Sequence, residues 1–338
     1  MSRSVEIVGG GLAGLALGLA LRRAGIEVTI FEAGGYPRHR VCGEFITGLS
    51  AKTIARLTLA PVFADALRHR EVAWFANGQS CGIQRLPAPA LGLSRFALDA
   101  RLAAAFVAAG GELRTHTRIT ALDEDPGRIF AHGRRRARSP WLGLKFHVRG
   151  LTLTRALELH LGDHAYTGLS RIEDGAINVC GLFRRRSLSA RGPQLLLEYL
   201  RASRLAALAD RLTAATVDEA SFCAVAGLAF DRTPLAARGI ALGDACAMIP
   251  PFTGDGMAMA FQSAEAALDP VLAYARGESS WPLACQAART ALRRRFRTRL
   301  ASAGLLHGFL LRPARQRWLA ALSRTRLLPF RPLYAALH

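Results

Sequence analysis

Lysine, long apolar runs and paired cysteines are what this chain of 338 residues has least of. Only Lys52 and Lys145 are lysines, so 43 of the 45 basic residues are arginines. No apolar run approaches the ~18 residues that a membrane-spanning helix needs. The six cysteines include no Cys-x-x-Cys pair, which argues against a zinc site and against a disulfide framework. We therefore expect a reduced, cytoplasmic setting and no bound metal.

Acidic residues are missing from one part of the chain. The net charge is +20, and the segment 279–338 contains 12 arginines but no aspartate or glutamate. Nucleic-acid binding would need aromatic residues interleaved with the basic ones, or a known base-reading motif, and the sequence has neither. Nucleic acid is therefore not expected as a partner, and the basic segment calls for another interpretation.

A nucleotide-binding pattern occupies the first 32 residues. An apolar strand over 5–8 leads into Gly9-x-Gly11-x-x-Gly14, a helix follows, and a second strand over 28–31 ends at Glu32. Gly9 would allow the tight turn, Gly11 the approach of a pyrophosphate, and Gly14 close packing of the helix on the sheet. Free amides at the helix start, including that of Ala13, would bind phosphate, and Glu32 would bind a ribose.

A second glycine pattern lies more than 200 residues further along. A buried-strand pattern over 239–242 ends at Gly243-Asp244, and a loop with two prolines leads to Gly254-x-Gly256-Met257 and an Ala/Met-rich helix. Together with the first pattern, it resembles the FAD-binding pattern of the p-hydroxybenzoate-hydroxylase-like flavoproteins. That superfamily includes aromatic hydroxylases, geranylgeranyl reductases and flavin-dependent halogenases.

The resemblance implies FAD as the cofactor and assigns several residues to it. Asp244 would hydrogen-bond the ribityl chain, and the backbone amides from Gly254 through Gly256 to Met257 would face the flavin pyrimidine edge. A helix N-terminus at that place would stabilise negative charge on the reduced flavin.

Residues outside the two glycine patterns also match the family. Arg95, at the start of a helix over 94–110, and Arg40 lie where relatives place arginines near the cofactor. The segment 37–44 resembles the Pro…Cys-Gly stretch of geranylgeranyl reductases and the Gly-Glu of halogenases. Cys42 is therefore either close to the flavin or simply a small buried residue. The catalytic residues are unknown, with Cys42, Glu44 and Tyr166 as candidates.

Organisation along the chain predicts an α/β fold. A Rossmann-like FAD-binding domain (1–50, 92–140 and 231–278) is interleaved with a smaller β-rich substrate domain (51–91 and 141–230), and basic helices follow over 279–338. Hairpins are expected at Asn77-Gly78 and Asp174-Gly175. Further predictions are strands near 113, 119, 129–131 and 221–230, a helix from about 49, one over 193–212, and breaks of the last helices at Pro313 and Pro329.

Two reactions remain open from the sequence. The first is monooxygenation (hydroxylation) of a hydrophobic or aromatic secondary metabolite or lipid. The alternative is a geranylgeranyl-reductase-like saturation of alkene double bonds, although the aromatic pattern of those reductases is absent around Tyr166. The halogenase tryptophan motif is also absent. A third, different class is an arginine-rich membrane-surface or nucleic-acid-binding protein with a vestigial flavin.

The reductant and the role of the last helices are also open. NADPH or a separate electron-donor protein could reduce the flavin, but His132 stands where direct users of NADPH carry aspartate. Apolar residues and arginines alternate between 284 and 311. This pattern predicts either a structural cap over the substrate domain or a helix lying on the inner face of a membrane. His147, His160 and His164 are expected to be satisfied or exposed histidines rather than catalytic ones.

Overall fold

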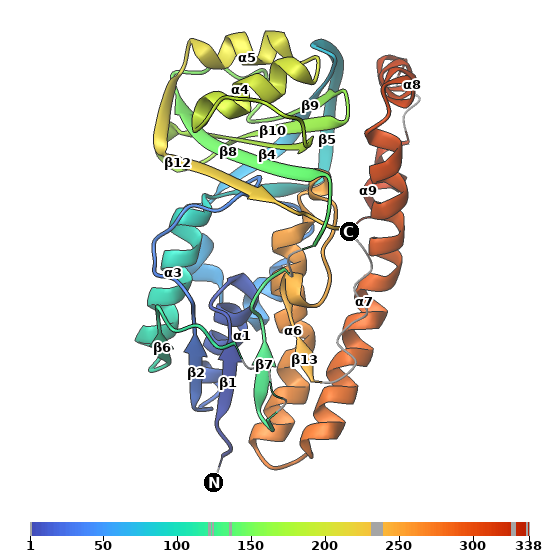
Figure 1. The fold of residues 1–338 in the computed structure, drawn as a ribbon. Coiled ribbons are helices and arrows are strands. Elements are labelled where there is room, and N and C mark those ends of the chain that lie inside the picture. The colour runs from blue at the N-terminus through green and yellow to red at the C-terminus, as the bar shows by residue number, and fades with distance from the viewer. Residues whose placement is uncertain are drawn as a thin grey trace.

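Two β-sheets organise the molecule (Figure 1). The computed structural model describes residues 2–120, 123, 125–134, 137–230, 239–325, 329–335 and 337. The first sheet is parallel, in the order β13-β7-β1-β2-β6. Its strands are β1 (Val5–Val8), β2 (Val28–Phe31), β6 (Glu112–Arg114), β7 (Arg128–Phe130) and β13 (Ile240–Ala241). This is the Rossmann-like sheet that the sequence predicted.

Helices from three parts of the chain pack on this sheet. In α1 (Leu12–Arg23) every residue from Leu12 to Leu21 is buried. A helix that is apolar all round belongs in the interior, and α1 contacts both α3 (Arg95–Ala108) and α6 (Asp255–Ala275). The short helix α2 (Ala51–Arg56) begins at Ser50, whose side chain accepts a hydrogen bond from the Thr53 amide. The first glycine pattern is therefore held inside the main core.

The second sheet has eight strands in the order β12-β8-β11-β10-β9-β4-β5-β3. Its strands are β3 (Phe45–Ile46), β4 (Leu67–Ala76), β5 (Gln79–Gly92), β8 (Trp141–Arg149), β9 (Leu157–Gly162), β10 (Ala165–Arg171), β11 (Ile177–Arg184) and β12 (Thr216–Ala226). All pairings in it are antiparallel except the parallel pair of β4 and β9. The helices α4 (Pro193–Ala202) and α5 (Ala206–Thr213) cover one face, at the top of Figure 1. The other face is turned toward the first sheet.

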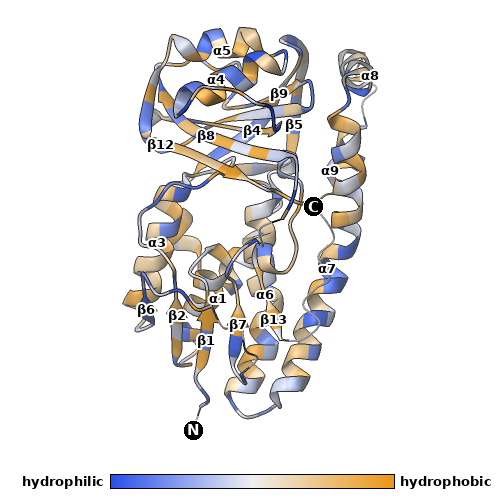
Figure 2. Ribbon diagram, viewed as in Figure 1, coloured by the Kyte–Doolittle hydropathy of each residue, from blue (hydrophilic) through white to orange (hydrophobic). Residues whose placement is uncertain are grey.

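The last helices run along one side of the molecule. They are α7 (Trp281–Leu310), α8 (Pro313–Arg324) and α9 (Phe330–Ala335). The buried residues of α7 are mostly three or four positions apart: Ala284, Cys285, Ala288, Leu292, Phe296, Arg299, Ala303 and Leu310. Figure 2 shows hydrophilic positions between the apolar ones along this helix. The helix thus presents one face to the body and its arginines mainly to the outside.

Most of the predicted elements are present, and the differences have local causes. The hairpins at Asn77-Gly78 and Asp174-Gly175 and the helix over 94–110 are confirmed. The single helix expected over 193–212 is wrong, because Arg204 adopts a φ of 61° and separates α4 from α5. Among the described residues no strand forms around Ile119, since His116 turns the chain with a φ of 53°. The strand expected at 221–230 lies at 216–226, and the domain boundaries stay a prediction.

Candidate cofactor and substrate site

The carboxyl ends of the parallel strands open into a cavity of about 820 Å³. Parallel α/β sheets bind their ligands at this edge, and the volume is within the ~300–1,000 Å³ that ligand pockets usually have. The opposite wall comes from the second sheet. The predicted cofactor residues that line the cavity are Gly9, Gly11, Ala13, Glu32, Arg40, Arg95, Asp244, Gly254, Gly256 and Met257. The two glycine patterns, far apart in sequence, thus meet at one place.

The three glycines of the first pattern are needed for different steric reasons. Gly9 has a φ of 112°, and a Cβ there would lie 2.3 Å from the Ala131 carbonyl oxygen. A Cβ on Gly14 would lie 2.1 Å from the Gly9 carbonyl oxygen. Gly11 is different, because a Cβ on it would meet no atom within 4 Å and Gly11 faces the cavity. Gly9 and Gly14 are therefore required by the fold, whereas Gly11 leaves room for a ligand at the start of α1.

The Glu32 carboxylate is buried after the end of β2. Most of its hydrogen-bond acceptor positions are already used by groups of the protein. One oxygen accepts from the Gly10 amide at 2.8 Å. The other accepts from the Gly34 amide at 2.9 Å and from Arg38 Nη2 at 2.5 Å. Because an ionised carboxylate offers about four acceptor positions, one position remains for a ribose hydroxyl. Glu32 therefore also shapes the loop that follows β2.

Replacing Glu32 with alanine should weaken FAD binding by about 1.5–3 kcal/mol, since a charge-assisted hydrogen bond would be lost. The same change should also loosen the Gly34 loop, so Glu32→Gln is the better probe because it keeps the side-chain size. We expect a higher dissociation constant for both variants in a titration of apoprotein followed by flavin fluorescence. An unchanged constant in both would show that Glu32 does not contact the cofactor.

Arg95 and Arg40 converge on one buried carboxylate. Arg95 forms two hydrogen bonds to Asp99, at 2.7 and 2.8 Å, and Arg40 Nε donates to the same carboxylate at 3.1 Å. Burial would lower the pKa of Arg95, but the Asp99 carboxylate outweighs this and raises it. Asp99 is fully buried, so it fixes both guanidinium groups on the wall of the cavity. The two arginines make that wall positively charged.

The second glycine pattern supplies an acid and a helix N-terminus. Asp244, in the short 3₁₀ turn η3 (Gly243–Ala245), is open to the cavity, and the surrounding protein raises its pKa by desolvation. After η4 (Pro251–Thr253), Gly254 takes a left-handed φ of 73° and α6 begins. A Cβ on Gly256 would meet no atom within 4 Å. The first amides of a 21-residue helix therefore border the cavity.

The three catalytic candidates have different surroundings. Cys42 and Tyr166 both line the cavity, but burial raises the pKa of the Cys42 thiol and that of the Tyr166 hydroxyl. A thiol with a raised pKa is a poor nucleophile. Glu44 does not line the cavity, because it is fully buried behind it. A nucleophilic role for Cys42 is therefore not supported. Glu44 instead interacts with other buried side chains.

Glu44 is the centre of a buried charge cluster formed with Lys145, His147 and His39. Its carboxylate lies 2.6 Å from His147 Nε2 and 3.3 Å from Lys145 Nζ, and it accepts the Arg95 amide at 3.0 Å. Lys145 Nζ also lies 3.2 Å from His39 Nδ1. His39 lines the cavity and stacks on Phe96. Sequence reasoning missed Lys145 and His39, although an isolated lysine among 43 arginines was a signal.

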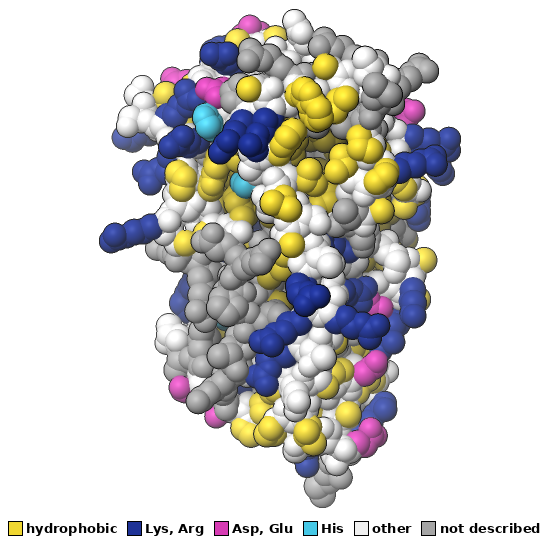
Figure 3. Space-filling view, turned by 90° about the vertical axis from the view of Figure 1, so that its right-hand side faces the viewer, with side chains coloured by type: hydrophobic (Ala, Val, Ile, Leu, Met, Phe, Trp, Pro, Cys, Tyr) yellow, Lys and Arg dark blue, Asp and Glu magenta, His cyan; other side chains and the backbone are white. Residues whose placement is uncertain are grey.

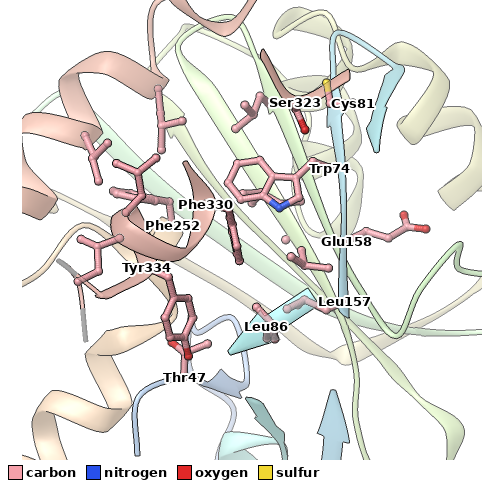
Figure 4. A pocket seen from close by; sticks show the side chains of 18 of the residues that line it. Thr47, Trp74, Cys81, Leu86, Leu157, Glu158, Phe252, Ser323, Phe330 and Tyr334 are labelled. Carbon is pink, nitrogen blue, oxygen red and sulfur yellow. The ribbon is translucent and has the colours of Figure 1, made fainter. Parts of the chain in front are cut away.

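A second, apolar cavity of about 130 Å³ adjoins the first (Figure 4). Phe45, Leu159, Gly168 and Phe252 line both cavities. The other walls come from the second sheet, with Val72, Trp74, Cys81, Leu86, Leu157 and Leu161, and from the last helices, with Leu306, Leu310, Gln316, Ser323, Phe330, Leu333, Tyr334 and Leu337. The large cavity and the apolar chamber thus share part of their walls.

Neither a metal cluster nor a bilayer-spanning helix is found in the described part of the chain. No cluster of three or more histidine, cysteine, aspartate or glutamate side chains there could hold a metal ion. No helix among the same residues is both long and apolar enough to cross a bilayer.

Comparisons with known proteins agree with this architecture. Residues 7–53 match the family profile of the NAD(P)-binding Rossmann-like domain. The menaquinone reductase of Mycolicibacterium smegmatis is 27% identical over 132 residues, which make up 38% of this chain and 32% of that protein. The matched segment therefore spans about a third of that relative's length.

Solved structures resemble the chain over almost its whole length. The flavin-dependent brominase Bmp2 has a TM-score of 0.78 at 16% identity, covering 99% of this chain and 92% of that one. A geranylgeranyl bacteriochlorophyll reductase-like protein from Thermoplasma acidophilum gives 0.77 at 15% identity, covering 99% and 95%. The p-nitrophenol 4-monooxygenase PnpA from Pseudomonas putida gives 0.75 at 16%, covering 98% of each. The chain therefore has the fold that flavin-dependent monooxygenases, halogenases and geranylgeranyl-reductase-like proteins share, as the sequence predicted.

Proposed function

We propose that this protein is an FAD-dependent oxidoreductase acting on a small hydrophobic or aromatic substrate, with monooxygenation as its reaction. The observation that carries the proposal is the meeting of both glycine patterns on the wall of the large cavity, next to an apolar chamber. A dinucleotide needs room at a helix start, a cationic wall for its phosphates and polar groups for its sugars. The cavity offers all three, so its residues fit FAD.

Particular residues would hold the parts of the cofactor. The pyrophosphate would lie over Gly11 at the start of α1, where a Cβ would find empty space. Glu32 would bind the adenosine ribose and Asp244 the ribityl chain. The α6 amides at Gly256 would face the flavin ring and favour its reduced, anionic form. Bound FAD would supply the redox chemistry, either oxygen insertion or hydride transfer.

Alkene reduction is the second candidate, because two comparisons favour it. The sequence match is to a menaquinone reductase, and a reductase-like protein is among the similar solved structures. The apolar chamber suits a ring or a chain of an alkene substrate equally well. The two reactions differ in their need for oxygen, since monooxygenation consumes it and alkene reduction does not.

Reconstitution tests the cofactor, and oxygen dependence tests the reaction. The purified chain should bind FAD non-covalently and give a flavin spectrum, and failure to bind FAD in excess would end the proposal. The holoprotein is then reduced anaerobically with dithionite and mixed with candidate substrates, with and without oxygen. A product one oxygen atom heavier, formed only with oxygen, supports monooxygenation. A saturated product formed without oxygen supports reduction instead.

NADPH alone should reduce the bound flavin slowly. His132 follows β7 on the wall of the large cavity, at the place where direct users of NADPH carry an acid. We expect a separate electron-donor protein to reduce the flavin faster. Stopped-flow measurement of flavin bleaching under anaerobic conditions checks this. Rapid stoichiometric reduction by NADPH at physiological concentration would contradict the prediction.

The last helices are proposed to act as the cap of the substrate chamber. Leu306 and Leu310 of α7 and Phe330 of α9 line the chamber. These apolar side chains therefore already pack against the rest of the protein. Figure 3 shows the side of the molecule along which the last helices run. Apolar side chains gather in its upper half, with basic ones around and below them. Among the described residues of these helices, the exposed large apolar side chains are Leu283 (59%), Leu305 (79%) and Trp318 (62%).

The membrane interpretation of the same helices is tested with vesicles. If the helices serve only as a cap, the holoprotein should not co-sediment with strongly anionic vesicles at low salt. Binding that needs anionic lipid and fades as salt is added would instead support a location at the membrane surface. Neutral vesicles at the same salt concentration are the control.

A further inference from the structure

Gly168 is a glycine in the interior of a strand, at a place where the fold does not require one. It lies in the middle of β10, paired with Cys180 on one side and Leu159 on the other. Its φ is not left-handed, and a Cβ there would meet only two atoms within 4 Å, Phe45 Cε1 at 3.8 Å and the Glu158 carbonyl oxygen at 3.9 Å. Both are ordinary contacts, so alanine would fit without a clash.

The other glycines within the strands of the second sheet each have a steric reason. Gly82 has a left-handed φ of 104°. On the rest, a Cβ would lie 2.3–2.8 Å from an atom of another residue: Gly92 (His69), Gly143 (Val41), Gly162 (Ser203) and Gly181 (Phe183). Glycine inside a strand lowers stability, because it loses more conformational freedom on folding and packs no side chain. The glycine at 168 therefore needs an explanation other than the fold.

A side chain at position 168 would project toward both cavities. Gly168 lines the large cavity and the apolar chamber. Residues directly opposite each other in an antiparallel pair carry their side chains on the same face of the sheet. Of its two partners, Leu159 lines both cavities and Cys180 lines the large one. Tyr166, two positions earlier on the same face of β10, also lines the large cavity. The missing side chain thus leaves space at the shared wall.

The two cavities differ in the chemistry of their walls. None of the residues assigned to FAD lines the chamber. Among the described residues of the chamber wall there is no lysine, arginine or histidine, and Glu158 is the one charged group. Both Glu158 oxygens are engaged, one with the Thr154 amide and the other with His160 and Arg211. A charged group in the chamber would lose its hydration without gaining a partner, so the chamber suits a neutral, apolar occupant.

We propose that the space at Gly168 receives the end of the substrate that meets the cofactor, while the rest of the substrate lies in the chamber, so that residue 168 sets the largest substrate. The chamber volume of about 130 Å³ is close to the ~150 Å³ of a cavity that holds one benzene ring. The shared wall also carries the rings of Phe45 and Phe252. The substrate class is therefore a neutral, flat, apolar molecule longer than one ring. This inference rests on the proposed function, since it takes the ligand of the large cavity to be FAD.

Phenol, with one ring, and 4-phenylphenol, with two, test the inference. Both are neutral at neutral pH and carry the same polar group. Their dissociation constants are measured by calorimetry on the full chain reconstituted with FAD. The variants are Gly168→Ala and Gly168→Val. Cys81→Leu is the matched control, because Cys81 lines the chamber but not the large cavity.

In the parent protein, 4-phenylphenol should bind more tightly than phenol. We expect Gly168→Val to weaken the binding of 4-phenylphenol about 10-fold or more and Gly168→Ala about 3-fold, with phenol changed less than about 2-fold in both. Cys81→Leu should weaken both probes alike, because it fills the chamber itself. FAD affinity should stay within about 2-fold in the Gly168 variants. The urea midpoint of Gly168→Ala should rise, since alanine is favoured over glycine inside a strand.

Unchanged binding of 4-phenylphenol in Gly168→Val would overturn the inference, as would equal losses for the two probes or a parent protein that does not prefer the longer one. An equal loss of FAD affinity would assign the space to the cofactor and overturn it too. If Gly168→Val does not fold, Gly168→Ala decides. A parent chain that binds no FAD would remove the proposed function, and the same comparison on the apoprotein then decides this inference. Normal FAD binding with equal losses for both probes would remove this inference alone.

Discussion

Replacing Lys145 with methionine should lower the free energy of unfolding by about 3–5 kcal/mol. Lys145 and Glu44 are both completely buried, and removing Lys145 takes the ammonium from a buried carboxylate that keeps only His147 and the Arg95 amide as partners. Methionine keeps the length of the chain and its apolar stem, so the loss reports on the ammonium group. Urea denaturation followed by tryptophan fluorescence measures the change.

Two further variants show whether the cluster causes the loss. Lys52→Met, at the other, exposed lysine, should change stability by less than about 0.5 kcal/mol. In the double variant Glu44→Gln with Lys145→Met no unpaired carboxylate remains, so the effects should be non-additive by about 1–3 kcal/mol. Additive losses would contradict the assignment of the pair.

The cluster also predicts how the loss of unfolding free energy in Lys145→Met depends on pH. Burial alone would raise the pKa of Glu44, but His147 and Lys145 hold it below its usual value. The stabilisation is therefore present at neutral pH and disappears as the pH falls through the folded pKa. The cost of Lys145→Met should accordingly shrink in acid, where Glu44 becomes protonated.

Substituting Gly11 with alanine should weaken FAD binding at least about 100-fold, because a methyl group would stand where the pyrophosphate must approach several amides. The unfolding free energy of the apoprotein should stay within about 0.5 kcal/mol, since no atom lies within 4 Å of the added Cβ. Titration of apoprotein with FAD and urea denaturation measure the two effects separately.

Gly14→Ala is the matched variant and should behave in the opposite way. Its Cβ would lie 2.1 Å from the Gly9 carbonyl oxygen, so α1 must move away from the strand turn and stability should fall by ~2 kcal/mol or more. If Gly11→Ala unfolded the protein, or bound FAD normally, the two glycines would have been assigned the wrong roles.

Local patterns in the sequence were sufficient for the framework of the fold. The strand, glycine turn and helix over 5–23 occupy neighbouring residues, and their steric requirements are local. The same holds for the turns at Asn77-Gly78 and Asp174-Gly175, where φ is positive as a hairpin demands. Such features depend on a few neighbouring residues and can be predicted without knowing the rest of the molecule.

The chemistry of the chamber could not be predicted in this way. Trp74 and Gln316 are 242 positions apart, and only the packing of α8 on the second sheet makes them part of one wall. The same is true of Glu44, in the loop before β3, and Lys145 of β8. Arg204 is another case, since its left-handed backbone comes from docking α4 and α5 rather than from a residue that favours such a φ.

The winding of the chain between the two sheets has a consequence for how the protein folds. The first sheet takes strands from 5–31, from 112–130 and finally from 240–241, and the second sheet takes the segments between them. Closing such long loops costs entropy before the contacts that reward it can form, so high contact order should make folding slow. No continuous fragment contains all strands of one sheet without strands of the other, and a piece ending before residue 240 lacks the edge strand β13 and α6. Limited truncation should therefore yield aggregation-prone chains rather than a separable nucleotide-binding half.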